Sequence, residues 1–405
     1  MHTIIETELQ YAAQNYHPLP VVLVKGRGVY VWDDAGKQYL DMMGAYSAVS
    51  FGHCHPKLVQ TLIHQSQELA VVSRAFHSDK LAPFLAYACN LLDQEKALVM
   101  NTGAEAVETA IKAMRKWGYT IKGIPEPEAE IIVCAGNFHG RTTTIISFSA
   151  EEQYKSGFGP LTLGFKIIPY GDAAALEAAI THKTAGFLVE PIQGEAGIRV
   201  PPAGYLKQCA EICARNNVLL VCDEVQTGLG RTGKILACNH ENVKPDGIIL
   251  GKALGGGLLP VSLFMSKAEI MDVFTPGDHG STFGGNALAS AVALEALQVL
   301  TDENLAQNAA EMGRYFMAEL KKISSPLIKE VRGQGLFIGL EMDVSHVSAR
   351  DMCIQLLQDG LLTKDTHATV LRLCPPLIIT REQIDAALKI IKHSLKHIED
   401  WINKK

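Results

Sequence analysis

The segment GIILGKALGGGLLPVSLFMSK (residues 247–267) contains two short apolar runs on either side of a glycine-rich turn. Successive side chains of a strand point to opposite faces, so a run that is apolar throughout is typical of a central strand in a sheet covered on both faces. Between the two runs stands one charged side chain, that of Lys252. Burying an unpaired ammonium costs several kcal/mol, so Lys252 needs a partner, access to water or a chemical role.

Three similar runs precede this segment: AEIIVCAGN (129–137), AGFLVEPI (185–192) and NVLLVCDEV (217–225). Amphipathic helical patterns lie between several of them, for example at 105–118 and 203–216. Strands that alternate with helices predict an α/β fold, with a mostly parallel central sheet covered by helices.

After about residue 287 the pattern changes to long helical segments and a few short strands. The helical patterns cover 287–300, 304–323, 349–359 and 381–402, and the strand patterns include 335–342 and 369–377. We therefore predict a large domain over 55–300 and a smaller α+β domain over 301–405. The N-terminal segment, 1–54, reads as an arm and a strand pair that pack with the smaller domain.

The composition limits the classes of function. The chain has 405 residues, 47% of them hydrophobic and 20% charged, with a net charge of −6. No long basic run is present, so we expect neither a nucleic acid nor an anionic membrane as partner. Glycines and Pro260 interrupt the most apolar window, which makes it a poor membrane span. Nine single cysteines without a CxxC pair and an N-terminus without a targeting pattern predict a cytoplasmic protein.

Polar residues follow each of the predicted parallel strands. In open α/β sheets, ligands bind outside the carboxyl ends of the strands, so these residues should meet in one crevice. They are Phe138, His139 and Arg141 after the first strand, Glu190 and Glu195 after the second, Asp223, Glu224 and Gln226 after the third, and Lys252 after the fourth. Polar residues at one strand end would mean little, but their presence at four successive strand ends indicates a binding site.

Two interpretations of Asp223 and Lys252 are open from spacing alone. One is an internal ion pair between them. The other is a lysine that forms a Schiff base with pyridoxal phosphate (PLP), with the carboxylate paired to the pyridinium nitrogen. The helix that begins at Thr102-Gly103-Ala104 offers free N–H groups to a phosphate, or is an ordinary capped helix with Glu105 in a capping box.

Three other features carry weaker signals. GLGRTG (228–233) matches a dinucleotide-binding pattern, but no long helix follows it. GHCHP (52–56) resembles a metal cluster but lacks further ligands at zinc-like spacing. We interpret His139 as a positioned, hydrogen-bonded residue and not as the catalytic base, because Lys252 already supplies a base.

Taken together, the motifs resemble those of the class III (ω-amino acid) aminotransferases, which have the fold type I architecture of PLP enzymes. The resemblance runs nearly end to end, through NYHPLP (15–20), YSAVSFGHCHP (46–56), NTGAEAVETAIKAMRKWGYTIKG (101–123), GNFHGRT (136–142), VEPIQGEAGI (189–198), CDEVQTGLGRTG (222–233), LGKALGGGLLPVS (250–262), HGSTFGGN (279–286) and RLCPPL (372–377). Such a set is specific for the class.

The resemblance implies PLP as cofactor and assigns the residues that hold it. Lys252 would form the Schiff base and Asp223 would pair with the pyridine nitrogen. The other contacts would come from Gln226 at the ring hydroxyl, Phe138 and Val225 on the two ring faces, Gly103 and Ala104 at the phosphate, and Ser281 and Thr282 of the neighbouring subunit, also at the phosphate. The last two contacts imply a homodimer.

The same resemblance implies how substrates are bound. Arg141 would bind the α-carboxylate of glutamate or 2-oxoglutarate, and Tyr16 and Tyr46 would orient ornithine so that its δ-amine meets the cofactor. Glu195 and Arg372 would act as a switch, paired while ornithine is bound and apart for the second carboxylate of the keto acid. The alternative for this pair is a plain structural salt bridge.

The implied activity is transfer of the δ-amino group of L-ornithine to 2-oxoglutarate. The products would be glutamate 5-semialdehyde, which cyclises to pyrroline-5-carboxylate, and glutamate. Alternatives are an N-acetylornithine or 4-aminobutyrate aminotransferase of the same class, or a PLP-fold scaffold without catalysis. Phe283, Ala104 and Cys374 depart from what relatives often have at these positions, which touches fine specificity and not the reaction class.

Overall fold

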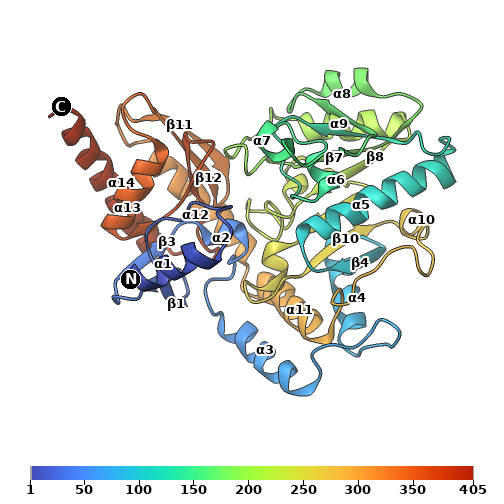
Figure 1. Ribbon diagram of the computed structural model, residues 1–405, viewed down its shortest axis with the longest axis horizontal. Coiled ribbons are helices and arrows are strands. Elements are labelled where there is room, and N and C mark those ends of the chain that lie inside the picture. Colours follow the sequence, from blue (N-terminus) through green and yellow to red (C-terminus); the bar gives the residue numbers. More distant parts are fainter. Residues whose placement is uncertain (1, 405) are drawn as a thin grey trace.

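The predicted apolar strands lie side by side in one seven-stranded sheet of the computed structural model, which describes residues 2–404 (Figure 1). In spatial order the sheet consists of β4 (Lys96–Met100), β10 (Ser262–Ser266), β9 (Gly247–Leu250), β8 (Leu219–Asp223), β7 (Thr184–Val189), β5 (Glu130–Cys134) and β6 (Phe165–Ile168). The pairs from β9 to β6 are parallel, which confirms the mostly parallel sheet. β10 runs antiparallel to both neighbours, because the connection from β9 is too short for a parallel crossover.

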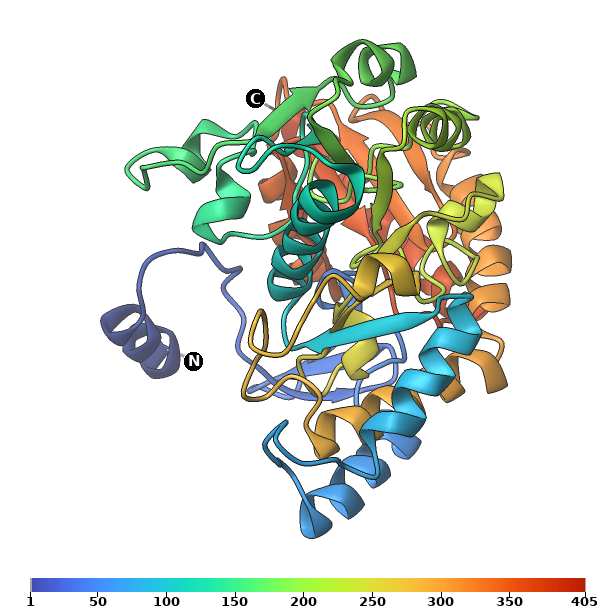
Figure 2. The same ribbon diagram turned by 90° about the vertical axis from the view of Figure 1, so that its right-hand side faces the viewer.

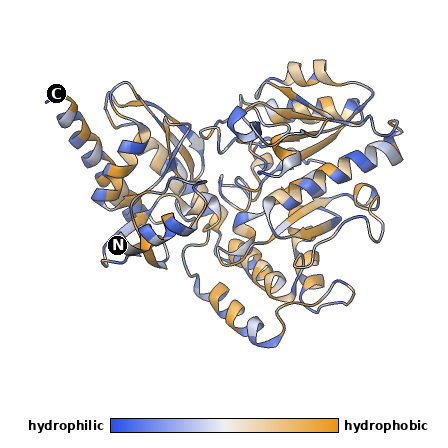
Figure 3. Ribbon diagram, viewed as in Figure 1, coloured by the Kyte–Doolittle hydropathy of each residue, from blue (hydrophilic) through white to orange (hydrophobic). Residues whose placement is uncertain are grey.

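Helices cover both faces of this sheet, as the continuous apolar strands require. α5 (Gly103–Trp117) packs on one face, and its buried residues form a core with the side chains of β5, β8 and β9 that point the same way. On the other face lie α3 (Pro56–Glu68), α4 (Leu81–Leu92), α9 (Tyr205–Arg215) and α11 (Ala287–Asp302). Shorter helices are α6 (Thr143–Ile146), α7 (Glu152–Lys155), α8 (Ala173–Ala179) and α10 (Ala268–Met271). In Figure 3 the strands are mainly hydrophobic and the helices are two-sided.

The two ends of the chain lie together beside this layered unit (Figure 1). β1 (Leu23–Arg27), β2 (Tyr30–Asp33) and β3 (Gln38–Asp41) form a sheet with β13 (Leu361–Leu362), which pairs parallel to β3. A second four-stranded sheet has the order β11 (Ile328–Gln334), β12 (Phe337–Met342), β15 (Val370–Leu373) and β14 (Asp365–Thr366). α12 (Leu305–Leu320), α13 (Ala349–Asp359) and α14 (Arg381–Ile402) complete this part. The domain boundaries at residues 54/55 and 300/301 stay predictions.

The N-terminal helix α1 (His2–Tyr11) projects from the rest of the chain (Figure 2). Tyr11 is 79% exposed and Tyr16, in the linker that follows, is 73% exposed. Among the described residues, no helix combines the length and the apolar character that crossing a bilayer requires.

Candidate functional site

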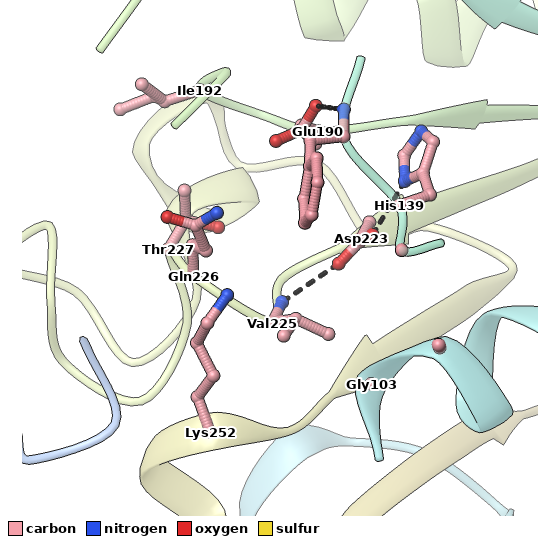
Figure 4. A pocket seen from close by; sticks show the side chains of 12 residues that line it. Gly103, His139, Glu190, Ile192, Asp223, Val225, Gln226, Thr227 and Lys252 are labelled. Carbon is pink, nitrogen blue, oxygen red and sulfur yellow. Dashed lines mark hydrogen bonds and ion pairs between the residues drawn. The ribbon is translucent and has the colours of Figure 1, made fainter. Parts of the chain in front are cut away.

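The carboxyl ends of the parallel strands open into one pocket between the sheet and the start of α5 (Figure 4). It is lined by Gly103, Ala104, Phe138, His139, Gly140, Glu190, Ile192, Asp223, Val225, Gln226, Thr227 and Lys252. Every residue predicted to hold the cofactor is in this set except Ser281 and Thr282. Of the residues predicted to meet at the strand ends, Arg141, Glu195 and Glu224 do not line this pocket. Glu224 is instead buried behind it, where its carboxylate accepts from Thr227 Oγ1 and Cys238 N.

Asp223, the last residue of β8, is fixed by two hydrogen bonds at the floor of the pocket. His139 Nδ1 donates to its Oδ2 at 2.6 Å, and the backbone N–H of Val225 donates to its Oδ1 at 3.0 Å (Figure 4). Burial lowers the pKa of His139, but the hydrogen bond and the charge of Asp223 outweigh this effect, so the net shift is upward. The two hydrogen bonds fix the orientation of the Asp223 carboxylate, which is a suitable partner for a cation in the pocket. His139 is thus a positioned, hydrogen-bonded residue.

Lys252 lies two residues after the end of β9 and points its side-chain nitrogen into the same pocket (Figure 4). Its backbone has a φ of 47°, in the left-handed region that non-glycine residues rarely adopt. Burial lowers its pKa to about 8, although the charge of Glu195 opposes this shift. Within residues 2–404 no hydrogen bond or ion pair joins Lys252 to Asp223, so the structure does not contain the internal ion pair that spacing left open. A neutral, unpaired amine at this place is a nucleophile and a base.

The start of α5 forms the opposite wall of the pocket. Thr102 caps the helix, and its Oγ1 accepts from Glu105 N while Glu105 Oε2 accepts from Thr102 N, so the capping box is present. Gly103 and Ala104 are the first two helical residues, and their N–H groups have no acceptor within the helix. A Cβ at Gly103 would lie 3.1 Å from Val225 Cγ1, which explains the glycine. The helix is therefore both capped and free to bind a phosphate.

The residues of this pocket fit PLP. Asp223 suits a protonated pyridine nitrogen, Lys252 suits an aldehyde, and the start of α5 suits a phosphate. Asp223, Lys252 and the start of α5 line the same pocket, so a single molecule that carries a pyridine nitrogen, an aldehyde and a phosphate can contact all three.

Glu195 and Arg372 form an ion pair at the edge of the pocket, and Gln226 joins them. Arg372 Nη1 donates to Glu195 Oε1 at 2.6 Å, and Arg372 Nη2 donates to Gln226 Oε1 at 2.7 Å. Gln226 Nε2 in turn donates to Glu195 Oε1 at 3.0 Å. The Gln226 amide is thus bonded to the pair in this structure, and its contact with a cofactor hydroxyl stays a prediction. The Arg372 side chain is almost fully buried, whereas the Glu195 side chain is 24% exposed.

Tyr46 lies against this ion pair, with its ring centroid 5.1 Å from Cζ of Arg372. It belongs to α2 (Gly44–Ser47), a single turn whose residues all have positive φ: 53° at Gly44, 45° at Ala45, 59° at Tyr46 and 76° at Ser47. A left-handed conformation costs roughly 1–2 kcal/mol per non-glycine residue, so the surroundings must impose this turn. A Cβ at Gly44 would lie 2.6 Å from the carbonyl oxygen of Cys374, which leaves room for glycine alone.

The remaining predicted residues lie outside the pocket. Arg141 is exposed, and its guanidinium carbon lies 3.8 Å from the ring centroid of Tyr154 and 5.6 Å from that of Phe138. Tyr16 is exposed on the N-terminal linker. Ser281 Oγ accepts from Asn101 Nδ2 at 2.9 Å, and Thr282 is exposed. The roles predicted for these residues stay predictions.

The two weaker motifs have structural explanations. Arg231 of GLGRTG is fully buried and donates to Leu336 O, Pro375 O and Ser50 Oγ, so it joins the large sheet's loop to the C-terminal and N-terminal parts of the chain. His53 of GHCHP pairs with Asp41 at 2.7 Å. In the part of the chain that the structure describes, no three His, Cys, Asp or Glu side chains are placed to hold a metal ion.

Glu190 is a pocket residue whose role the sequence did not reveal. Its Oε2 accepts from Phe138 N at 3.0 Å and its Oε1 from Gly194 N at 3.4 Å, so it joins the loop after β5 to the loop that carries Glu195. Burial raises its pKa to about 7. Its position directly after β7 indicated that Glu190 belongs to the site, but the sequence did not indicate which groups it binds.

Comparison with known proteins agrees with this geometry. The family model described as Aminotransferase class-III matches residues 11–395. An ornithine aminotransferase of Halalkalibacterium halodurans is 55% identical over 393 residues, which are 97% of this chain and 98% of that protein. A solved structure of the Toxoplasma gondii ornithine aminotransferase, with PLP at partial occupancy in its active site, has a TM-score of 0.98 and 44% identity over 99% of this chain and 95% of that one.

A solved structure named acetylornithine aminotransferase, from Elizabethkingia anophelis, has a TM-score of 0.90 and 48% identity over 98% of this chain and 99% of that one. The family match spans nearly all of the chain, and the relatives are covered over almost their full lengths. The chain belongs to the class III aminotransferases and has their fold type I architecture.

Proposed function

We propose that this protein is a PLP-dependent ornithine δ-aminotransferase, which transfers the δ-amino group of L-ornithine to 2-oxoglutarate. The observation that carries this proposal is the Glu195–Arg372 pair beside Lys252, with one partner fully buried and the other partly exposed. One site has to accept a diamino acid and then a diacid, and an ion pair that opens changes the charge of the site without rebuilding it. The 55% identity to ornithine aminotransferases over nearly the full length supports the same substrate.

The residues of the pocket divide the chemistry among them. When bound, PLP supplies an electron sink that makes the proton on the amine-bearing carbon acidic. His139 fixes the Asp223 carboxylate through its hydrogen bond, and Asp223 would pair with the protonated pyridine nitrogen of the cofactor. Lys252 would hold the cofactor through its aldehyde, and its free side-chain amine would serve as the base for the proton on the δ-carbon of ornithine. Burial lowers the pKa of Lys252 to about 8, closer to neutral pH than the pKa of an exposed lysine, which favours a role as a base.

The substrate residues would act in sequence. While Glu195 neutralises Arg372, the pocket would admit the positively charged ornithine, and Tyr46 would orient it. When 2-oxoglutarate enters, Glu195 would turn towards solvent, Arg372 would bind one carboxylate and Arg141 the other. The products would be glutamate 5-semialdehyde, which cyclises to pyrroline-5-carboxylate, and glutamate.

The proposal includes a homodimer in the cytoplasm. Ser281 and Thr282 lie outside the pocket of their own chain, which supports a site completed by a neighbouring subunit. All nine cysteines are free thiols and most are buried, in keeping with a reducing compartment.

A substrate panel tests the proposal. The purified holoenzyme is assayed with ornithine, N-acetylornithine and 4-aminobutyrate as donors and 2-oxoglutarate as acceptor. We expect ornithine to give a kcat/KM at least a hundredfold above the other two. A preference for N-acetylornithine or 4-aminobutyrate would move the protein to another branch of the family, and no transfer from any donor would support the scaffold alternative.

A further inference from the structure

The left-handed turn that carries Tyr46 is held from one side by a single carboxylate. Asp41, the last residue of β3, is 6% exposed and accepts three hydrogen bonds. Its Oδ1 accepts from the backbone N–H groups of Met43 at 2.8 Å and Gly44 at 2.9 Å, and its Oδ2 accepts from His53 Nε2 at 2.7 Å. The two amides that enter the turn are thus tied to one buried group.

His53 gives this carboxylate a fixed position. Its backbone pairs with Gly28 in both directions, with N–H···O distances of 2.7 and 2.9 Å. A Cβ at Gly26 would lie 2.8 Å from the imidazole of His53, so the ring packs closely on β1. His53 thus ties one oxygen of Asp41 to the neighbouring strand, while the other oxygen binds the amides of the turn.

On its other side the turn is aligned with the strand that carries Arg372. Cys374 N donates to Met42 O at 2.7 Å, two residues beyond Arg372 on the chain. The Cys374 carbonyl oxygen fills the place where a Cβ of Gly44 would stand. The turn that places Tyr46 beside Arg372 thus begins at two amides bound by Asp41, and its own backbone bonds, from Tyr46 N to Met43 O at 3.2 Å and from Val49 N to Gly44 O at 3.0 Å, continue it.

We propose that Asp41 and His53 are positioning residues for the amino donor, because they impose the left-handed turn that sets Tyr46 against Arg372. The inference rests on the proposed function for the identity of that donor. It also gives the GHCHP motif a role, with His53 as an anchor of substrate orientation and not as a metal ligand.

Kinetics of the two half-reactions test this role. We expect Asp41→Ala to lower kcat/KM for ornithine at least tenfold and that for 2-oxoglutarate less than threefold. Asp41→Asn should recover most of the loss, because its Oδ1 can still accept both amides and its Nδ2 can remain in contact with the His53 ring. An equal loss for the two substrates would overturn the proposal.

Asp33→Ala is a matched control. Asp33 is 5% exposed and lies in the same sheet, and its carboxylate also accepts two backbone amides, from Ala35 and Lys37, and one side-chain donor, the hydroxyl of Tyr39. None of these three partners lines the pocket. The variant should lower the unfolding temperature and leave the ratio of the two kcat/KM values unchanged. A changed ratio would mean that any damage to this sheet alters substrate choice, and would overturn the specific role of Asp41.

A double-mutant cycle separates positioning from general damage. If Asp41 acts through Tyr46, Asp41→Ala in a Tyr46→Ile background should lower kcat/KM for ornithine by less than twofold. The same loss in both backgrounds would overturn the proposal. Should Asp41→Ala yield no folded protein, His53→Ala, which leaves both amide bonds of Asp41 in place, goes through the same cycle. Failure of the wild type to use ornithine refutes the proposed function, and the cycle is then measured with the donor that the panel identifies.

Discussion

Replacement of Glu195 by alanine should reverse the preference of the pocket between its two substrates. Glu195 holds Arg372 through a 2.6 Å hydrogen bond between charged groups, and 2-oxoglutarate has to displace it. Without the Glu195 carboxylate, the Arg372 guanidinium can bind a carboxylate of 2-oxoglutarate without first breaking an ion pair. The same free charge opposes the entry of ornithine, whose ammonium groups carry positive charge.

The size of the effect follows from the environment of the pair. Hydrogen bonds to charged groups contribute about 1.5–3 kcal/mol. Since the Glu195 side chain is 24% exposed and water weakens the pair, the lower end applies, and about 1.5 kcal/mol corresponds to about tenfold in affinity. We expect 2-oxoglutarate to bind about tenfold more tightly and ornithine about tenfold more weakly. The variant removes the one carboxylate that pairs with the fully buried Arg372 among the described residues, and leaves the neutral Gln226 as a hydrogen-bond partner, so unfolding should become easier by about 1–3 kcal/mol.

Single-turnover absorbance changes of the cofactor report each half-reaction separately. Glu195→Gln is the matched control, because it keeps a hydrogen-bond acceptor and removes the charge, and it should fall between wild type and Glu195→Ala. If the ratio of the two kcat/KM values stays within threefold of wild type in Glu195→Ala, the pair is a structural salt bridge and the switch is refuted.

Three further predictions concern other parts of the account. Tyr46→Ile should raise the KM for ornithine more than the KM for 2-oxoglutarate, and an equal rise in steady-state assays would remove Tyr46 from substrate choice. Because burial lowers the pKa of Lys252 to about 8, the apoprotein carries a charged lysine at a stability cost below that pH. Lys252→Met should therefore raise the urea midpoint of the apoprotein at pH 7. This gain should shrink between pH 8 and 10.5, because the unfolded chain binds more protons than the folded one in that range and the wild type becomes more stable as the pH rises. A gain that stays constant with pH would contradict the lowered pKa of Lys252. Arg231→Met leaves several buried acceptors unpaired and should cost roughly 3 kcal/mol or more in urea unfolding, whereas a loss below about 1 kcal/mol would show that Arg231 joins nothing of consequence.

Local pattern was enough to predict the central sheet and the pocket. The strands β7, β8 and β9 are buried along their whole length, so their sequences are apolar throughout, and their polar ends have to meet at one edge. The edge strands β4 and β6 were missed because partly exposed side chains interrupt their apolar pattern. Edge strands carry a weaker signal than central ones for this reason.

Hydrogen-bond partners between distant segments were not predictable in the same way. Glu190 and Phe138 are 52 residues apart, and Gln226 and Arg372 are 146 residues apart. The pairing of buried donors with acceptors depends on how the loops pack. Neither the hydrophobic periodicity of the sequence nor the spacing of its motifs predicts that packing. The left-handed turn at Tyr46 is a further example, because Ala45, Tyr46 and Ser47 have no propensity for positive φ and adopt it under tertiary contacts.

The central claim is a covalent bond between PLP and Lys252, and reduction tests it directly. The purified holoenzyme is treated with borohydride, digested and analysed by mass spectrometry, with Lys252→Ala treated in parallel. The account predicts a pyridoxyl group on Lys252 alone and no lysine-bound pyridoxyl group in the variant. A pyridoxyl group on a different lysine, or an unchanged cofactor spectrum in Lys252→Ala, would contradict it.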